Sequence, residues 1–69
     1  MNESDIESKL LEMSTMFRNK RYDEAELLLQ DCIDTSRVLT KQFILEMIES
    51  TDDPEVKDRV TKLYFLNYI

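Results

Sequence analysis

Apolar residues recur along most of the chain at intervals of three and four, which places them on one side of an α-helix. The first such series consists of Ile6, Leu10, Met13 and Phe17. Ser4 is followed three residues later by Glu7, the spacing of a capping box at a helix start. We therefore predict a first helix over about residues 4–19.

A short polar turn separates this helix from a second periodic segment. Asn19 is the residue best able to take a left-handed conformation in a chain without glycine, so the first helix should stop near Asn19 and Lys20. Asp23 and Glu24 suit the first turn of the next helix, because carboxylates there interact favourably with the helix dipole. The second helix is predicted over about residues 22–34, with an apolar face of Ala25, Leu28, Leu29, Cys32 and Ile33.

The stretch "DTSR", residues 34–37, contains three residues that commonly cap helices. It either breaks the chain or lies within one long helix, and we favour a break with a third helix starting at Thr35 or Ser36. This third helix, over about residues 36–50, is apolar around much of its circumference, so we expect it to form the buried centre. Its apolar residues are Val38, Leu39, Phe43, Ile44, Met47 and Ile48.

The clearest helix start in the chain lies in "STDDPEVKD", residues 50–58. Pro54 suits a first helical position, and Asp53 before it suits the cap. The last helix is predicted over about residues 54–68. One face of it carries Val56, Val60, Leu63, Tyr64 and Tyr68.

Length and composition agree with an all-α bundle of three to four helices. The chain has 69 residues, enough for a single domain over residues 1–69 and too few for a second core. It contains no glycine, which disfavours tight hairpins and phosphate-binding loops.

The charge balance limits the classes of partner. The formal net charge is −6, which argues against direct binding of a nucleic-acid backbone. No apolar stretch is long enough for a transmembrane helix, and the acidic start does not resemble a signal peptide, so we expect no membrane insertion. Cys32 is the single cysteine, which excludes an intramolecular disulfide and makes the reducing cytoplasm the simplest location.

Most catalytic chemistry is also disfavoured. Without histidine there is no catalytic triad or imidazole ligand, and without glycine there is no Walker loop or dinucleotide fingerprint. Cys32 lies on the predicted apolar face beside acidic Asp31, which should raise the pKa of its thiol. The acids of "DDPEVKD" lack the glycine and terminal glutamate of a calcium loop. We therefore expect no enzyme activity, no catalytic residues, no metal and no cofactor.

The final turns, "LYFLNYI", are apolar around most of the helix. They either insert among the other helices as core or contact another protein, since exposed apolar clusters often mark contact sites. For a contact surface, the first candidates are Phe65, Leu66, Tyr68 and Ile69. Leu27, which falls off the apolar stripe of its helix, and Leu39 are second candidates.

The segment "RYDEAELLLQDCID", residues 21–34, resembles the turn and second helix of a tetratricopeptide repeat. The aromatic, small, bulky and small positions of that family are filled in order by Tyr22, Ala25, Leu29 and Cys32. The resemblance covers residues 5–36, a single unit, and departs from the family pattern at Met13 and Lys20. It implies helix-hairpin packing and protein binding rather than catalysis.

Three functions are compatible with these observations. The primary hypothesis is a small acidic protein–protein interaction module, acting as an adaptor, a chaperone or an inhibitor of a larger protein. An alternative is a homodimeric structural or regulatory subunit, which binds a second copy of itself. A further alternative is an acidic mimic of nucleic acid that blocks a DNA- or RNA-binding protein.

Overall fold

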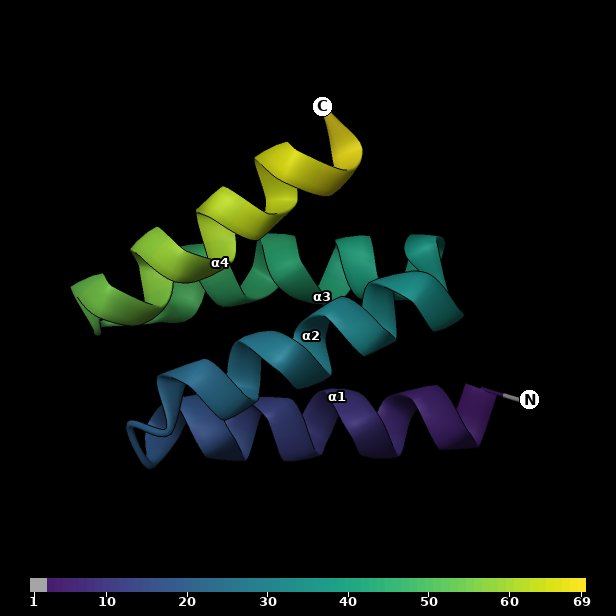
Figure 1. Ribbon diagram of the computed structural model, residues 1–69, viewed down its shortest axis with the longest axis horizontal. Coiled ribbons are helices and arrows are strands. Elements are labelled where there is room, and N and C mark those ends of the chain that lie inside the picture. The colour runs from purple at the N-terminus through teal and green to yellow at the C-terminus, as the bar shows by residue number, and fades with distance from the viewer. Residues whose placement is uncertain (1–2) are drawn as a thin grey trace.

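The computed structural model describes the backbone of residues 3–69 and the side chains of residues 5–69. Four helices, α1 to α4, account for nearly all of this part of the chain, and consecutive helices run in opposite directions (Figure 1). Their bounds are Glu3–Arg18, Tyr22–Thr35, Arg37–Ser50 and Pro54–Tyr68. The predicted all-α bundle is confirmed, and each helix end lies within one residue of its predicted position. The capping role expected of the Ser4 side chain lies outside the described side chains.

The turn after α1 closes with a left-handed residue, but not the predicted one. Lys20 has a φ of 62°, whereas Asn19 does not have a positive φ. The Arg21 N–H donates to the Met16 carbonyl at 2.9 Å, and the Lys20 N–H donates to the Phe17 carbonyl at 3.1 Å. This is the hydrogen-bond pattern of a Schellman motif, which requires its left-handed residue one position beyond Asn19. The predicted stop near Asn19 and Lys20 is confirmed. The choice of Asn19 as the left-handed residue was wrong, because hydrogen bonds to the carbonyls of the last turn fix that position and side-chain preference does not.

A single residue separates α2 from α3, so the predicted break is confirmed. Ser36 has an extended backbone, and its hydroxyl oxygen accepts a hydrogen bond from the Leu39 N–H at 3.4 Å. On the other side, the Ser36 N–H and the Thr40 hydroxyl both donate to the Cys32 carbonyl, at 2.9 Å each. Ser36 therefore ends one helix and caps the next.

The start of α4 also follows the prediction. The Asp53 carboxylate accepts a hydrogen bond from the Glu55 N–H at 2.9 Å, and Pro54 occupies the first helical position. The second oxygen of the same carboxylate accepts from the Tyr22 hydroxyl at 2.8 Å. The cap of α4 is thereby joined to the first turn of α2.

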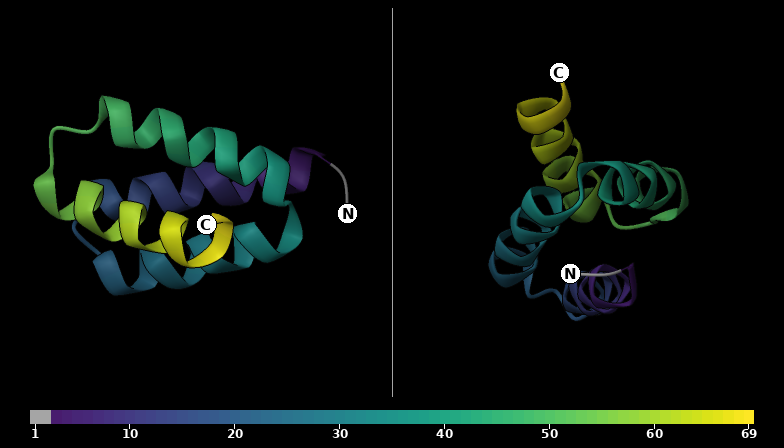
Figure 2. Two further views of the ribbon diagram at one scale, coloured as in Figure 1. Left: turned by 90° about the horizontal axis from the view of Figure 1, so that it is seen from above. Right: turned by 90° about the vertical axis from the view of Figure 1, so that its right-hand side faces the viewer.

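The core lies around α2, which contacts the other three helices (Figure 2). All four predicted stripe residues of α1 are buried, and α2 buries Ala25, Leu29, Cys32 and Ile33. By contrast, α3 buries only Thr40 and Ile44, and Val38 is 69% exposed. The prediction that the third helix forms the buried centre is therefore wrong. Its position at the side of α2 leaves part of its apolar circumference facing water.

Candidate protein-interaction surface

The last turns of α4 and the residue that follows the helix expose three large apolar side chains. Phe65 is 56% exposed, Leu66 is 80% exposed and Ile69 is 82% exposed. We refer to these three residues as the C-terminal surface. The neighbouring Val60 is buried and Tyr64 packs against the core, so the apolar residues at this end divide between an inner and an outer side.

The inner side of the same turns is anchored to α2 by a pair of amides. The Gln30 side-chain N–H donates to the Asn67 side-chain oxygen at 3.1 Å, and the Asn67 side-chain N–H donates back to Gln30 at 3.2 Å. Asn67 also donates to the Leu63 carbonyl at 2.8 Å, one turn earlier in its own helix. These bonds fix the rotation of α4 about its axis, and so fix which side chains face outward.

A second anchor joins the end of α4 to the start of α3. The Tyr68 hydroxyl donates to the Arg37 carbonyl at 2.7 Å, and the Arg37 guanidinium lies 4.7 Å from the centre of the Tyr68 ring. The Tyr68 ring stacks on Tyr64 with a centroid distance of 5.3 Å. Burial raises the pKa of the Tyr68 hydroxyl, as expected for a phenol held against protein. Tyr68 thus stabilises the position of α4 and is half-buried, unlike the three residues of the C-terminal surface.

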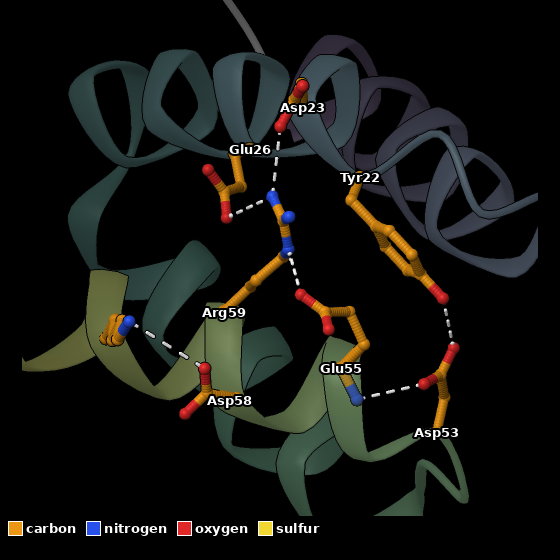
Figure 3. A network of polar contacts seen from close by, with 8 residues as sticks. Tyr22, Asp23, Glu26, Asp53, Glu55, Asp58 and Arg59 are labelled. Atoms are coloured by element: carbon orange, nitrogen blue, oxygen red, sulfur yellow. Dashed lines mark hydrogen bonds and ion pairs between the residues drawn. The ribbon is translucent and has the colours of Figure 1, made fainter.

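The first half of α4 is held by a network around Arg59 (Figure 3). The Arg59 guanidinium donates to Asp23 and Glu26 of α2 at 3.1 Å each, and to Glu55 of its own helix at 2.6 Å. It also lies 5.1 Å from the centre of the Tyr22 ring. Hydrogen bonds to these carboxylates, led by that to Glu55, raise the pKa of Arg59 further above its ordinary value. Both halves of α4 are therefore fixed against the bundle.

Leu27 continues the apolar surface onto α2. It is 75% exposed and lines a groove between α2 and α4 together with Leu63, Gln30 and two acidic residues of the Arg59 network. Leu66 follows Leu63 by three residues, so the two side chains are neighbours on one side of α4. The surface available to a partner thus extends from the C-terminal surface to Leu27.

Leu39 lies apart from this surface. It is half-buried and packs against the core, so we leave it, with Tyr68, out of the contact set. The sequence reasoning also missed exposed apolar residues, among them Leu11 at 62% exposure. Leu11 lies one position off the apolar stripe of α1, as Leu27 does on α2, so the same rule could have found it.

Three further possibilities raised by the sequence concern a reactive Cys32 thiol, a metal site and a membrane-spanning helix. Cys32 is fully buried, and burial, with a smaller contribution from Asp31, raises the pKa of its thiol to about 11. In the described part of the chain, no cluster of three or more His, Cys, Asp or Glu side chains could hold a metal ion. None of the described helices is long and apolar enough to cross a membrane.

Comparisons with protein-family models, with curated proteins and with solved structures found no match. Any inference about function therefore depends on the geometry of the chain itself.

Proposed function

We propose that this protein acts by binding another protein through the C-terminal surface and the adjoining Leu27. One observation carries the proposal: the same helical turns that expose Phe65, Leu66 and Ile69 are held in place from behind by Asn67 and Tyr68. An apolar surface that is already ordered loses little conformational entropy on binding. The arrangement suits a contact site better than a fraying helix end.

The energy of such a contact can be bounded. Fully burying a large apolar side chain contributes about 1.5–3 kcal/mol, so the three partly exposed residues together offer about 4–6 kcal/mol. Association costs on the order of 4–15 kcal/mol in lost freedom of motion. The C-terminal surface alone is therefore insufficient for tight binding. A partner that also covers Leu27 and the groove beside Leu63 would supply the remainder.

The predicted resemblance of residues 5–36 to a tetratricopeptide hairpin is in keeping with this role, because that family binds proteins. It remains a prediction. A homodimer would use the same surface, with a second copy of the chain as the partner. The two possibilities differ in the mass of the purified protein as a function of concentration, which rises only for a homodimer.

The proposal is tested with the double variant Phe65→Asp with Leu66→Asp. Both side chains are more than half exposed, so the helix content measured by circular dichroism should remain that of the wild type. A charge-matched control is Ser8→Asp with Gln42→Asp, which adds two charges at exposed positions away from the C-terminal surface.

Binding is measured by affinity capture with the three tagged proteins in parallel, followed by mass spectrometry. We expect a protein that is retained by the wild type and by the control, and lost with the double variant. Light scattering over a concentration series separates self-association, because a homodimer shows a doubled mass without any partner. Equal retention by all three proteins would exclude the C-terminal surface as the contact site.

A further inference from the structure

A groove runs along the bundle between α1 and α3. Its first part is lined mainly by Leu10, Leu11 and Phe43. The next part shares Phe43 and continues past Met47. The last part shares Met47 and ends at Val56, near the start of α4. Adjoining parts share lining residues, so they follow one another along α1 and α3, and we call them together the α1–α3 groove.

The lining of the α1–α3 groove is apolar in its first part and becomes mixed towards α4, where serine, threonine and aspartate side chains join the apolar ones. Leu11 is 62% exposed, and Phe43 and Met47 are half-buried. Phe43 and Met47 lie four residues apart, so they follow one another along the same side of α3. Ser14 of α1 and Ser50 of α3 stand between these apolar residues and the end of the groove. Small side chains at such positions allow another backbone to approach closely.

The edges of the groove are acidic. Glu7, Glu46, Asp52 and Asp53 line it, against a single basic residue, Arg18. Asp53 is already engaged by the Tyr22 hydroxyl and the helix cap. The other three carboxylates are exposed and form no ion pair with any residue that the structure describes. The groove therefore presents apolar side chains beside carboxylates that form no ion pair, which favours a ligand that carries apolar residues flanked by positive charges.

We infer that the α1–α3 groove binds an amphipathic helix of another protein, with lysine or arginine residues flanking its apolar stripe. A helix satisfies its own backbone hydrogen bonds, whereas a peptide that binds by strand addition needs a strand edge, and the described residues form no strand. From Glu7 to Arg18 the groove follows α1 for about 16 Å, at about 1.5 Å per residue. This length accommodates about three helical turns.

This surface is separate from the C-terminal surface. No residue of the C-terminal surface, nor Leu27, lines the α1–α3 groove. The two surfaces could therefore be occupied at the same time, which would make the protein a bridge between two partners. The inference does not depend on the proposed function, since each surface has its own variants.

The probe is a synthetic amphipathic peptide of about three to four turns, with leucines at positions i, i+3, i+4 and i+7 and lysines beside them. Its affinity for the full chain is measured by fluorescence anisotropy, and its position by changes in the amide NMR spectrum. We expect the largest changes at Leu11, Ser14, Phe43 and Met47. A peptide with glutamates in place of the lysines should bind more weakly.

Two charge reversals provide the decisive comparison. Glu46→Lys changes the edge of the groove and should weaken binding by at least about fivefold, the factor that corresponds to the loss of a surface ion pair of about 1 kcal/mol. Glu12→Lys makes the same change in net charge at an exposed position of α1 that does not line the groove, and should weaken binding much less. Leu11→Gln should also weaken binding, whereas Leu66→Gln should not.

Several results would overturn the inference. If Glu46→Lys and Glu12→Lys reduce the affinity of the peptide equally, the peptide is attracted by the net charge of the protein and not by the groove. Spectral changes centred on Leu66 and Ile69 would place the peptide elsewhere. Concentration-dependent changes at Leu11 and Met47 without peptide would mean that a second copy of the chain occupies the groove. Absence of binding at millimolar peptide would show that the groove takes no such helix.

Discussion

Gln30 of α2 and Asn67 of α4 exchange two hydrogen bonds between their side-chain amides, across a separation of 37 residues in the sequence. Each amide uses both its donor and its acceptor, at 3.1 Å and 3.2 Å. Asn67 directly follows Leu66, the most exposed large apolar residue of α4. The order of the C-terminal surface therefore depends on a polar contact on the reverse side of the same turn.

Replacing Asn67 with alanine should loosen the end of α4. The substitution removes two bonds to Gln30 and one to the Leu63 carbonyl. Since each of these three hydrogen bonds contributes about 0.5–1.5 kcal/mol net, we expect the free energy of unfolding to fall by about 1.5–4.5 kcal/mol. Amide hydrogen exchange should speed up in residues 64–69 more than in α1.

The control for this variant is Gln42→Ala, an exposed amide on α3 that forms no hydrogen bond with any described residue. It should leave both stability and exchange close to the wild type. If Asn67→Ala and Gln42→Ala have equal effects, the amide pair does not hold α4.

Lys20 offers a stabilising substitution. A residue other than glycine in the left-handed region costs roughly 1–2 kcal/mol, and Lys20 has a φ of 62°. Lys20→Gly should therefore raise the free energy of unfolding by about 1 kcal/mol, measured by urea denaturation. Asn19→Gly is the matched control, because Asn19 has no positive φ and gains nothing from glycine there. A loss of stability with Lys20→Gly would contradict the assignment of the Schellman motif.

Local signals predicted the helix boundaries well. Pro54 with Asp53, and Ser36 between two periodic segments, act through hydrogen bonds within three residues of themselves. Such contacts are visible in the order of residues alone. The apolar stripe of α1 was equally readable, because a regular spacing of three and four leaves a single possible inner side.

The features that could not be predicted from the sequence depend on contacts between residues far apart in the chain. The burial of α3 is set by its place beside α2, and its broad apolar circumference gave no indication of which part would face water. Leu27 and Leu39 looked alike as candidates, yet one is exposed and the other packs against the core. The anchors behind the C-terminal surface join residues about 30 or more positions apart, and no periodicity marks them.

Arg59 should contribute more than an ordinary surface ion pair. Its guanidinium contacts three carboxylates and lies over the Tyr22 ring, and its side chain is 28% exposed. Isolated surface pairs contribute little, whereas this guanidinium joins several carboxylates and a ring in one network. Arg59→Met keeps the apolar stem and should lower stability at low salt by more than the loss of an isolated surface pair does.

The dependence of stability on salt separates the electrostatic contribution of Arg59 from its packing contribution. The difference between wild type and Arg59→Met should shrink as salt rises towards 1 M, where charges are screened within about 3 Å. The control is Lys62→Met, which removes an exposed pair with Asp58 at 3.8 Å and should have little effect. A difference that does not change with salt would assign the role of Arg59 to packing.

Cys32 should make stability depend on pH in the alkaline range. Burial raises the pKa of the thiol from an ordinary value of 9.0 to about 11 in the folded protein. Between these two values the unfolded chain has lost the thiol proton while the folded chain still holds it. Unfolding therefore releases a proton, and rising pH favours the unfolded state. The stabilisation is complete below about pH 9 and is lost as the pH approaches 11.

The measurement compares wild type with Cys32→Ala by urea denaturation at pH 8, 9.5 and 11. The variant lacks the titrating group, whereas the tyrosines and lysines that titrate in the same range are common to both proteins. We expect the wild type to be the more stable protein at pH 8, and this advantage to shrink by about 1–3 kcal/mol by pH 11, following about 1.4 kcal/mol per unit of pKa shift. An advantage that stays constant across the series would mean that the thiol ionises equally in both states, and that Cys32 is not sealed in the core.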